Sequence, residues 1–118
     1  GLDAIMLKSL PFEGTMKVRN KGVDITVIAD ETTIDMAFAA SRTLVVCGIS
    51  TAVLEATCLD PVDTRTLSYY EQTTPCLIAM NARIFDAVSS VLQSNTTMQL
   101  FDGTSEAELI QTVRRAAP

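Results

Sequence analysis

Short apolar runs recur along the chain and predict buried strands. Residues 23–30 (VDITVIAD), 51–59 (TAVLEATCL) and 76–80 (CLIAM) are rich in apolar side chains with little polar alternation. Such runs are typical of strands that are covered on both faces, as in a parallel sheet. Two weaker runs, at residues 14–20 (GTMKVRN) and 97–101 (TMQLF), predict a first and a last strand.

Amphipathic stretches follow the four later strands and predict helices. The longest covers residues 33–47, with Thr32 placed to cap its first turn and Gly48 as a good stop. Its end, TLVVC, is β-prone by propensity alone, so a strand there is the local alternative. The other helices are expected from Pro61 through Tyr70, after Asn81, and after Ser105, which can form a capping box with Glu108.

The order of these elements predicts the class of fold. A Lys-Gly turn at residues 21–22, where glycine would accept a positive φ, separates the first two strands, and helices alternate with strands after the second. Such alternation predicts an α/β domain with a mostly parallel sheet, helices on both faces and right-handed crossovers. Residues 1–118 are the length of one domain, and because residue 1 is Gly rather than Met we expect a piece of a longer protein.

Composition excludes several kinds of chemistry. The chain has no histidine, so it can form neither a Ser-His-Asp or Cys-His mechanism nor a His-based zinc or non-haem iron site. Its five glycines form no phosphate-binding loop. A net charge of −5 with scattered basic residues argues against nucleic acid, and no apolar run is long enough for a membrane span. Cys47, Cys58 and Cys76 are expected to be buried, reduced thiols of a cytoplasmic protein.

One crevice is the best candidate for a ligand. Open α/β sheets bind ligands beyond the carboxyl ends of their strands, where the topology switches direction. In this chain that crevice would be lined by Asp30, Glu31, Thr32 and Asn81, near helix N-termini. Helix N-termini favour anions, but Asp30 and Glu31 would oppose one, so helix caps and solvated loop residues are the simpler interpretation. We expect no catalytic, cofactor-binding or metal-binding residue in the chain.

Four short sequence motifs occur in the same order as in a known protein family. Residues 14–29 match its pattern of glycine, basic strand, second glycine and Asp-Val/Ile-Thr strand, and residues 48–55 (GISTAVLE) its Gly-Ile-x-Ala-x-Val phrase. Residues 59–67 (LDPVDTRTL) are similar to Lys-Pro-Leu-Asp-x-x-Thr, and residues 83–88 (RIFDAV) take the place of Gly-Gly-Phe-Gly. Together, over about residues 10–117, the chain resembles the C-terminal domain of transketolase-type thiamine-diphosphate enzymes. These include transketolase, deoxyxylulose-phosphate synthase and the beta subunits of 2-oxo acid dehydrogenases.

The resemblance implies a three-layer α/β/α fold. Its five-stranded mixed sheet would have the order 1-3-2-4-5 with strand 1 antiparallel, and residues 33–47 would form one helix. It also implies that thiamine diphosphate and Mg²⁺ lie between the other two domains of the parent enzyme, a transferase such as transketolase that transfers two-carbon or acyl units. This chain, inactive alone, would pack against other domains or subunits and help to form a homodimer. Asp30-Glu31-Thr32 and Met80-Asn81-Ala82 depart from the family's usual Tyr-Gly and acidic Gly-Gly phrases, which leaves the subfamily and substrate open.

Two other classes of function stay open. A stand-alone flavodoxin-like binding or regulatory module, such as a receiver, would use Asp30 at a strand end, but no paired acids precede it and the lysine near a later strand is missing. A small enzyme using carboxylates would need two acids converging in one crevice, for which only Asp30 and Glu31 qualify locally.

Overall fold

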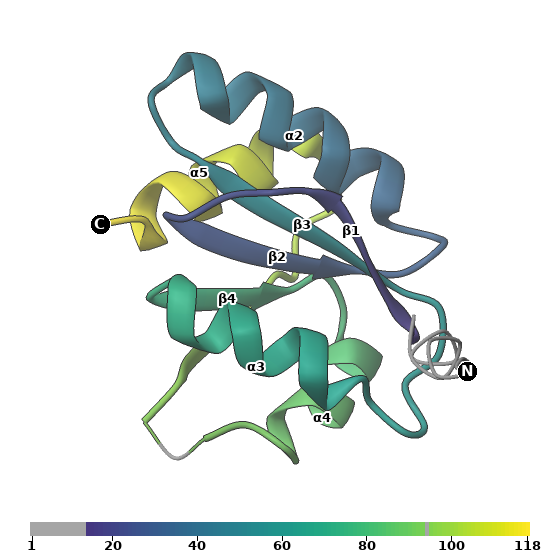
Figure 1. The fold of residues 1–118 in the computed structure, drawn as a ribbon. Coiled ribbons are helices and arrows are strands. Elements are labelled where there is room, and N and C mark those ends of the chain that lie inside the picture. The colour runs from purple at the N-terminus through teal and green to yellow at the C-terminus, as the bar shows by residue number, and fades with distance from the viewer. Residues whose placement is uncertain (1–13, 94) are drawn as a thin grey trace, which may run out of the picture.

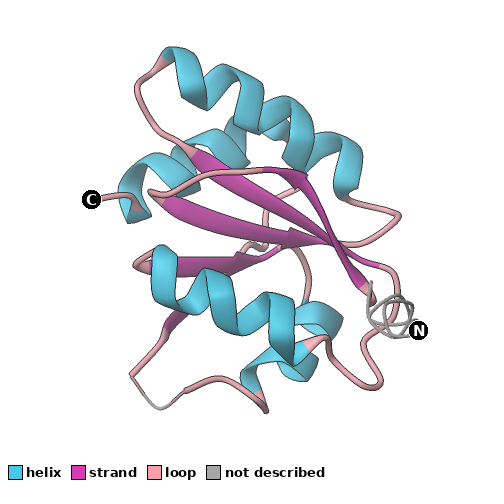
Figure 2. Cartoon of the chain, viewed as in Figure 1, coloured by secondary structure: helices cyan, strands magenta, loops and turns pink. Residues whose placement is uncertain are grey.

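The computed structural model describes residues 14–93 and 95–118. Strands and helices alternate along this part of the chain, as Figures 1 and 2 show. The elements in chain order are β1 (Met16–Asn20), β2 (Ile25–Ala29), α2 (Ile34–Val46), β3 (Thr51–Ala56), α3 (Thr64–Thr73), β4 (Cys76–Ala79), α4 (Ala82–Ser89), β5 (Thr97–Leu100) and α5 (Glu106–Ala116).

The strands form one mixed sheet in the order β1-β3-β2-β4-β5. β1 runs antiparallel to β3, and the other neighbours are parallel. In the centre, Val27 of β2 lies between Val53 of β3 and Ile78 of β4. Helices α2 and α5 cover one face and α3 and α4 the other (Figure 1). The predicted three-layer α/β fold, its strand order and its antiparallel first strand are confirmed.

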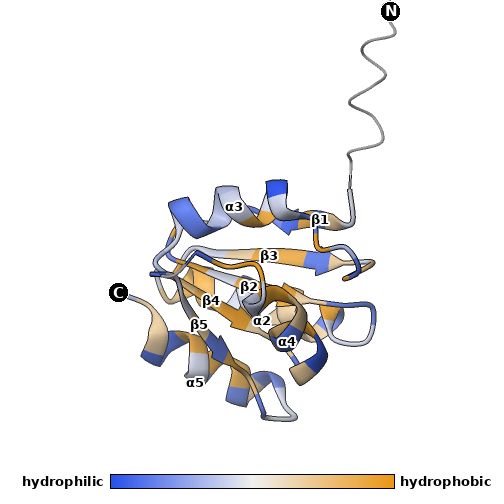
Figure 3. Ribbon diagram, turned by 90° about the horizontal axis from the view of Figure 1, so that it is seen from below, coloured by the Kyte–Doolittle hydropathy of each residue, from blue (hydrophilic) through white to orange (hydrophobic). Residues whose placement is uncertain are grey.

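The core follows the hydrophobic pattern of the sequence. Every residue of β2 and β4 is buried, as expected for strands covered on both faces, and Figure 3 shows the sheet as the most apolar layer. The edge strands β1 and β5 are largely exposed. In the described part of the chain, none of the helices has both the length and the apolarity to cross a lipid bilayer.

Helix α2 resolves the ambiguity at TLVVC. The segment is helical, because Leu44 is buried against the sheet while Val45 and Val46 lie exposed, which a strand covered on both faces would not allow. The helix ends in a Schellman motif at Gly48, whose φ is +85°. The Gly48 N–H donates to the Val45 carbonyl and the Ile49 N–H to the Leu44 carbonyl. The strand alternative is therefore wrong, and the predicted stop at Gly48 is confirmed.

Two helix starts differ from the prediction. Helix α2 has Thr33 rather than Thr32 at its N-cap, and the Thr33 hydroxyl accepts from the Asp30 N–H at 2.9 Å rather than from an N–H of the helix. Helix α3 begins at Thr64 rather than Pro61, because the Asp63 carboxylate accepts a hydrogen bond from the Thr66 N–H at 3.1 Å. The caps predicted at Asn81 and Ser105 are confirmed.

Gly22 is needed for a reason other than the one predicted. The positive φ angles in the described part of the chain belong to Gly14 and Gly48, not to Gly22. A Cβ atom on Gly22 would instead collide with the backbone of Thr51 and Ala52 at the start of β3. Close approach of two backbones, rather than turn conformation, requires glycine there.

Candidate functional site

Asp30 lies at the point where the connections of the sheet diverge. It directly follows β2, whose connection leads to α2 on one face, while α4 follows the neighbouring β4 on the opposite face. Adjacent strands whose connections leave in opposite directions open the crevice in which α/β proteins bind ligands. Here that position is filled by Asp30, which is only 2% exposed.

One carboxylate oxygen of Asp30 organises the turn into α2. Oδ1 accepts hydrogen bonds from the N–H of Thr32 at 3.0 Å and from its hydroxyl at 2.7 Å. The Thr33 hydroxyl donates to the same oxygen at 3.0 Å. The backbone carbonyl of Asp30 accepts from the N–H groups of Thr33 and Ile34, so a single residue holds the first turn of the helix. This explains why the threonine side chains do not cap α2 themselves.

The other oxygen of Asp30 reaches across the sheet to β4. Oδ2 accepts hydrogen bonds from Asn81 Nδ2 and from Arg83 Nη2, each at 2.9 Å. Asn81 in turn caps α4, since its Oδ1 accepts from the Ile84 N–H at 3.0 Å. The side chain of Arg83 is 60% exposed, so the guanidinium closes the ion pair from the solvent side. Asp30, Thr32, Thr33, Asn81 and Arg83, here called the Asp30 cluster, therefore join the starts of two helices on opposite faces.

The environment of Asp30 keeps its carboxylate ionised. Burial by itself would raise the pKa of the carboxyl group. Hydrogen bonds from Thr32, Asn81, Arg83 and Thr33 outweigh that effect and hold the pKa well below its usual range. A general acid or base for neutral pH needs a pKa near 7, so this shift has the wrong direction for proton transfer.

The geometry brings together three of the four predicted crevice residues. Thr32 and Asn81 each donate hydrogen bonds to the Asp30 carboxylate, whereas Glu31 is exposed and none of the hydrogen bonds or ion pairs found in the described residues joins its side chain to the cluster. The caps favoured as the simpler interpretation are what Asp30 and Asn81 provide. Two acids do not converge here, so the cluster gives no support to a carboxylate enzyme.

Sequence reasoning missed Arg83 and Thr33 as members of the cluster. Arg83 stands 53 positions after Asp30, and only the adjacency of β2 and β4 brings the two together. The sequence feature that could have pointed to Arg83 is its position two residues after the predicted helix cap Asn81, which itself follows a predicted buried strand. That feature gains meaning only when the strand order is known.

Residues of the Asp30 cluster do not fit a magnesium diphosphate. Both oxygens of Asp30 already accept hydrogen bonds, and the carboxylate would repel a phosphate. Throughout residues 14–93 and 95–118, no group of three or more histidine, cysteine, aspartate or glutamate side chains is arranged to hold a metal ion. We therefore derive no cofactor chemistry from these residues.

The three cysteines differ in their exposure. All three are free thiols. Cys76 is buried as predicted, and burial raises the pKa of its thiol. Cys47 and Cys58 are exposed, which corrects the prediction for both, because each follows an apolar run at a point where the chain turns outward into a loop.

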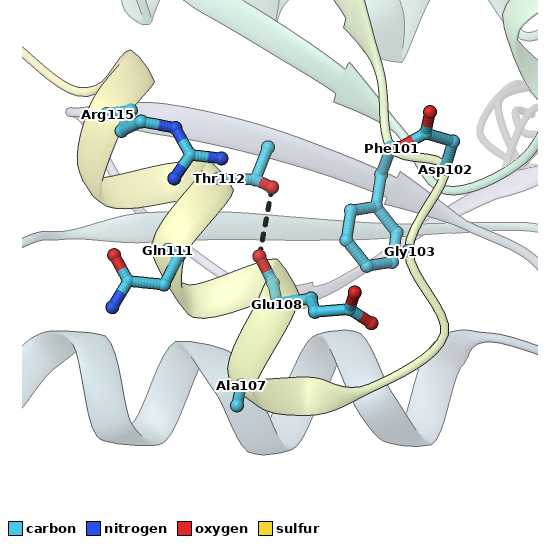
Figure 4. A pocket seen from close by; sticks show the side chains of 8 residues that line it. All are labelled: Phe101, Asp102, Gly103, Ala107, Glu108, Gln111, Thr112 and Arg115. Carbon is cyan, nitrogen blue, oxygen red and sulfur yellow. Dashed lines mark hydrogen bonds between the residues drawn. The ribbon is translucent and has the colours of Figure 1, made fainter.

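A second hollow lies between the β5–α5 loop and α5, with a volume of about 380 Å³ (Figure 4). Asp102 and Glu108 are the acidic residues that line it. The carboxylate of Glu108 is engaged in the capping box: Oε1 accepts from the N–H groups of Thr104 and Ser105 at 2.8 and 3.0 Å. These backbone hydrogen bonds and the one from the Ser105 hydroxyl lower the pKa of the carboxyl group. Glu108 is thus engaged at the helix start rather than available to a ligand.

Comparison with solved structures finds the same fold within two larger proteins. A split-gene transketolase, an inactive beta4 tetramer, superposes with a TM-score of 0.74 at 18% identity over 87% of this chain and 41% of that chain. The 2-oxoglutarate:ferredoxin oxidoreductase of Magnetococcus marinus, with 2-oxoglutarate, coenzyme A and succinyl-CoA bound, superposes with a TM-score of 0.73 at 16% identity. That match covers 92% of this chain and 21% of the other, so the chain spans less than half of either protein.

The family comparison concerns nearly the whole described chain. A search of curated protein sequences finds no match. The family model of the transketolase C-terminal domain matches residues 14–113, which run from the glycine before β1 into the last turns of α5. The strand order and the antiparallel first strand agree with that assignment. The chain belongs to the transketolase C-terminal domain family.

Proposed function

We propose that this chain is the non-catalytic C-terminal domain of a transketolase-type, thiamine-diphosphate-dependent enzyme, where it contributes domain packing and dimer formation. The family match over residues 14–113 carries the proposal. The Asp30 cluster supports the non-catalytic role, because the crevice in which related α/β folds hold ligands is occupied by the protein's own hydrogen bonds.

In this proposal the parent enzyme transfers two-carbon or acyl units. Thiamine diphosphate and Mg²⁺ would be bound by its other domains or subunits, which supply the carbanion chemistry. The structural neighbours are themselves parts of larger assemblies, and the split-gene transketolase chain, when it forms a beta4 tetramer, is inactive. This supports a domain that associates through its surfaces and depends on partners for activity. Free cysteines suit a cytoplasmic location.

Calorimetric titration tests the proposal at the level of the cofactor. Thiamine diphosphate with Mg²⁺ is titrated into this chain alone and into the complete parent enzyme. We expect no heat of binding with the chain alone and saturable binding with the parent. Tight binding to the isolated chain would contradict a cofactor-free domain, and a parent that binds no thiamine diphosphate would refute the enzyme class.

A further inference from the structure

The amino-terminal side of β2 carries another hollow, distinct from the one beside α5 and remote from the Asp30 cluster. Its volume is about 600 Å³, and its walls come from β1, the β1–β2 turn and α3. We call the apolar and basic side chains that line it, apart from the buried Tyr70, the β1–α3 surface: Val18, Lys21, Val23, Arg65 and Tyr69. β1 is the edge strand of the sheet that the described residues form, so this surface continues to that edge.

The β1–α3 surface exposes apolar side chains that the fold has not covered. Val18, Val23 and Tyr69 are 43%, 64% and 61% exposed. Tyr69 is nevertheless held in place, because its ring packs edge-to-face on the buried Tyr70 with centroids 4.9 Å apart. Clustered apolar side chains with a polar rim mark a contact surface rather than scattered exposure. A rigid, exposed tyrosine is also a typical anchor at protein interfaces.

The charged residues that the structure describes around this hollow have one sign. Lys21 and Arg65 line it, and none of the acidic residues within 14–93 and 95–118 does. No salt bridge of Lys21 is found within the part of the chain that the structure describes. The chain as a whole carries a net charge of −5, so this basic rim stands out from its surroundings. A basic rim beside exposed apolar side chains is complementary to a partner segment that carries carboxylates beside apolar side chains.

From the exposed apolar residues and the basic rim, we propose that the β1–α3 surface docks onto the thiamine-diphosphate-binding domain or subunit of the parent enzyme, on a segment that presents carboxylates beside apolar side chains. The inference rests on the proposed function and names the surface through which the domain packs. The partner's carboxylates would pair with Lys21, and its apolar side chains would cover Val18, Val23 and Tyr69.

Zero-length crosslinking of the complete parent enzyme tests this directly. A carbodiimide joins a lysine amine to a carboxylate only when the two are in direct contact. We expect an amide crosslink between Lys21 and an Asp or Glu of the thiamine-diphosphate-binding domain or subunit, identified by mass spectrometry. Lys21→Arg should abolish the crosslink while keeping the charge. Lys17→Arg is the matched control: Lys17 lies on the opposite face of β1, beside Glu55, and its replacement should leave the crosslink in place.

Affinity measurements complete the test. Lys21→Glu and Tyr69→Ala should each weaken association with the partner domain or subunit about tenfold or more, as expected for interface anchors. Both side chains are exposed, so unchanged thermal unfolding would show that folding is intact.

Three results would overturn the inference. Crosslinks of Lys21 to a second copy of this chain would replace the partner with self-association. An active, thiamine-dependent parent in which Lys21 is never crosslinked and both variants associate normally would refute the surface but leave the proposed function standing. A parent that binds no thiamine diphosphate would refute both.

Discussion

The two ends of β2 differ in how their charged groups are used. At the carboxyl end of β2, both oxygens of Asp30 accept hydrogen bonds. Before the amino end of β2, Lys21 has no salt bridge to any residue that the structure describes. The first region is buried and its groups serve the fold. The second exposes Tyr69 and Val23 beside two cations. The end of the sheet where α/β proteins usually bind ligands is closed here, and the end that is usually structural is open. The contrast teaches that a contact surface is better sought where apolar side chains lie exposed beside a charge such as Lys21, which has no salt bridge in the described residues, than at the usual ligand end of the sheet.

Removing the Asp30 carboxylate should have the largest effect. Asp30→Ala leaves Arg83 and Asn81 without their acceptor and removes the carboxylate oxygen that accepts from Thr32 at the turn into α2. Breaking a buried ion pair costs about 3–5 kcal/mol, and we expect about 3 because Arg83 can reach water. Urea unfolding measures the change. A loss below about 1 kcal/mol would show that the Asp30 cluster does not hold the helix starts together.

A methyl group at Gly22 should come next. Gly22→Ala forces a Cβ atom into the backbone of Thr51 and Ala52, which cannot move without disturbing the pairing of β2 with β3. We expect a loss of about 2–3 kcal/mol by the same assay, in the range for overpacking. Lys21→Ala, at the exposed neighbouring position, is the control and should change stability by less than about 0.5 kcal/mol. Equal effects of the two variants would contradict the close-approach explanation.

The contribution of Asp30 should depend on pH. Its folded-state pKa is depressed, so its stabilisation is fully present above the unfolded value near 3.8 and is lost as the pH falls from there toward the folded value. Asp30→Asn cannot ionise, and we expect it to be less stable than the original chain by about 2 kcal/mol at pH 7. The difference should narrow below about pH 4. Parallel stability curves for the two proteins down to pH 3 would rule out the charge as the cause.

Truncating Tyr69 should change stability least. Its side chain is 61% exposed, so Tyr69→Ala is expected to alter the free energy of unfolding by less than about 0.5 kcal/mol. Tyr70→Ala is the matched comparison, because Tyr70 is buried and its loss should cost about 3 kcal/mol. If Tyr69→Ala were as damaging as Tyr70→Ala, the β1–α3 surface would be part of the core rather than a contact surface.

Local patterns predicted the strands and helices, the family resemblance supplied the strand order, and neither predicted the whole Asp30 cluster. Apolar runs at β2, β3 and β4, caps at Asn81 and Ser105 and the stop at Gly48 are local features, and short-range physics determines them. The Asp30–Arg83 pair depends on which strands are neighbours, which no local pattern encodes. Gly22 shows the same limit, since its need for a small side chain comes from β3 and not from its own turn.

Cysteine exposure was mispredicted for a related reason. Cys47 belongs to an apolar stretch, but the helical period places Leu44 inward and leaves its neighbours outside. Apolar composition alone does not fix which side of a helix is buried. The helical period and the sheet against which it packs decide that.

Carbon-13 NMR can decide whether the protein's own hydrogen bonds occupy the crevice at Asp30. The chemical shift of the Asp30 carboxyl carbon is followed from pH 7 down to the lowest pH at which the chain stays folded. A carboxylate held by Thr32, Asn81 and Arg83 should keep the chemical shift of its ionised form at pH 3.8 and below. Half-protonation at pH 3.8 or above would mean that these hydrogen bonds do not hold the charge, and the crevice would again be a candidate ligand site.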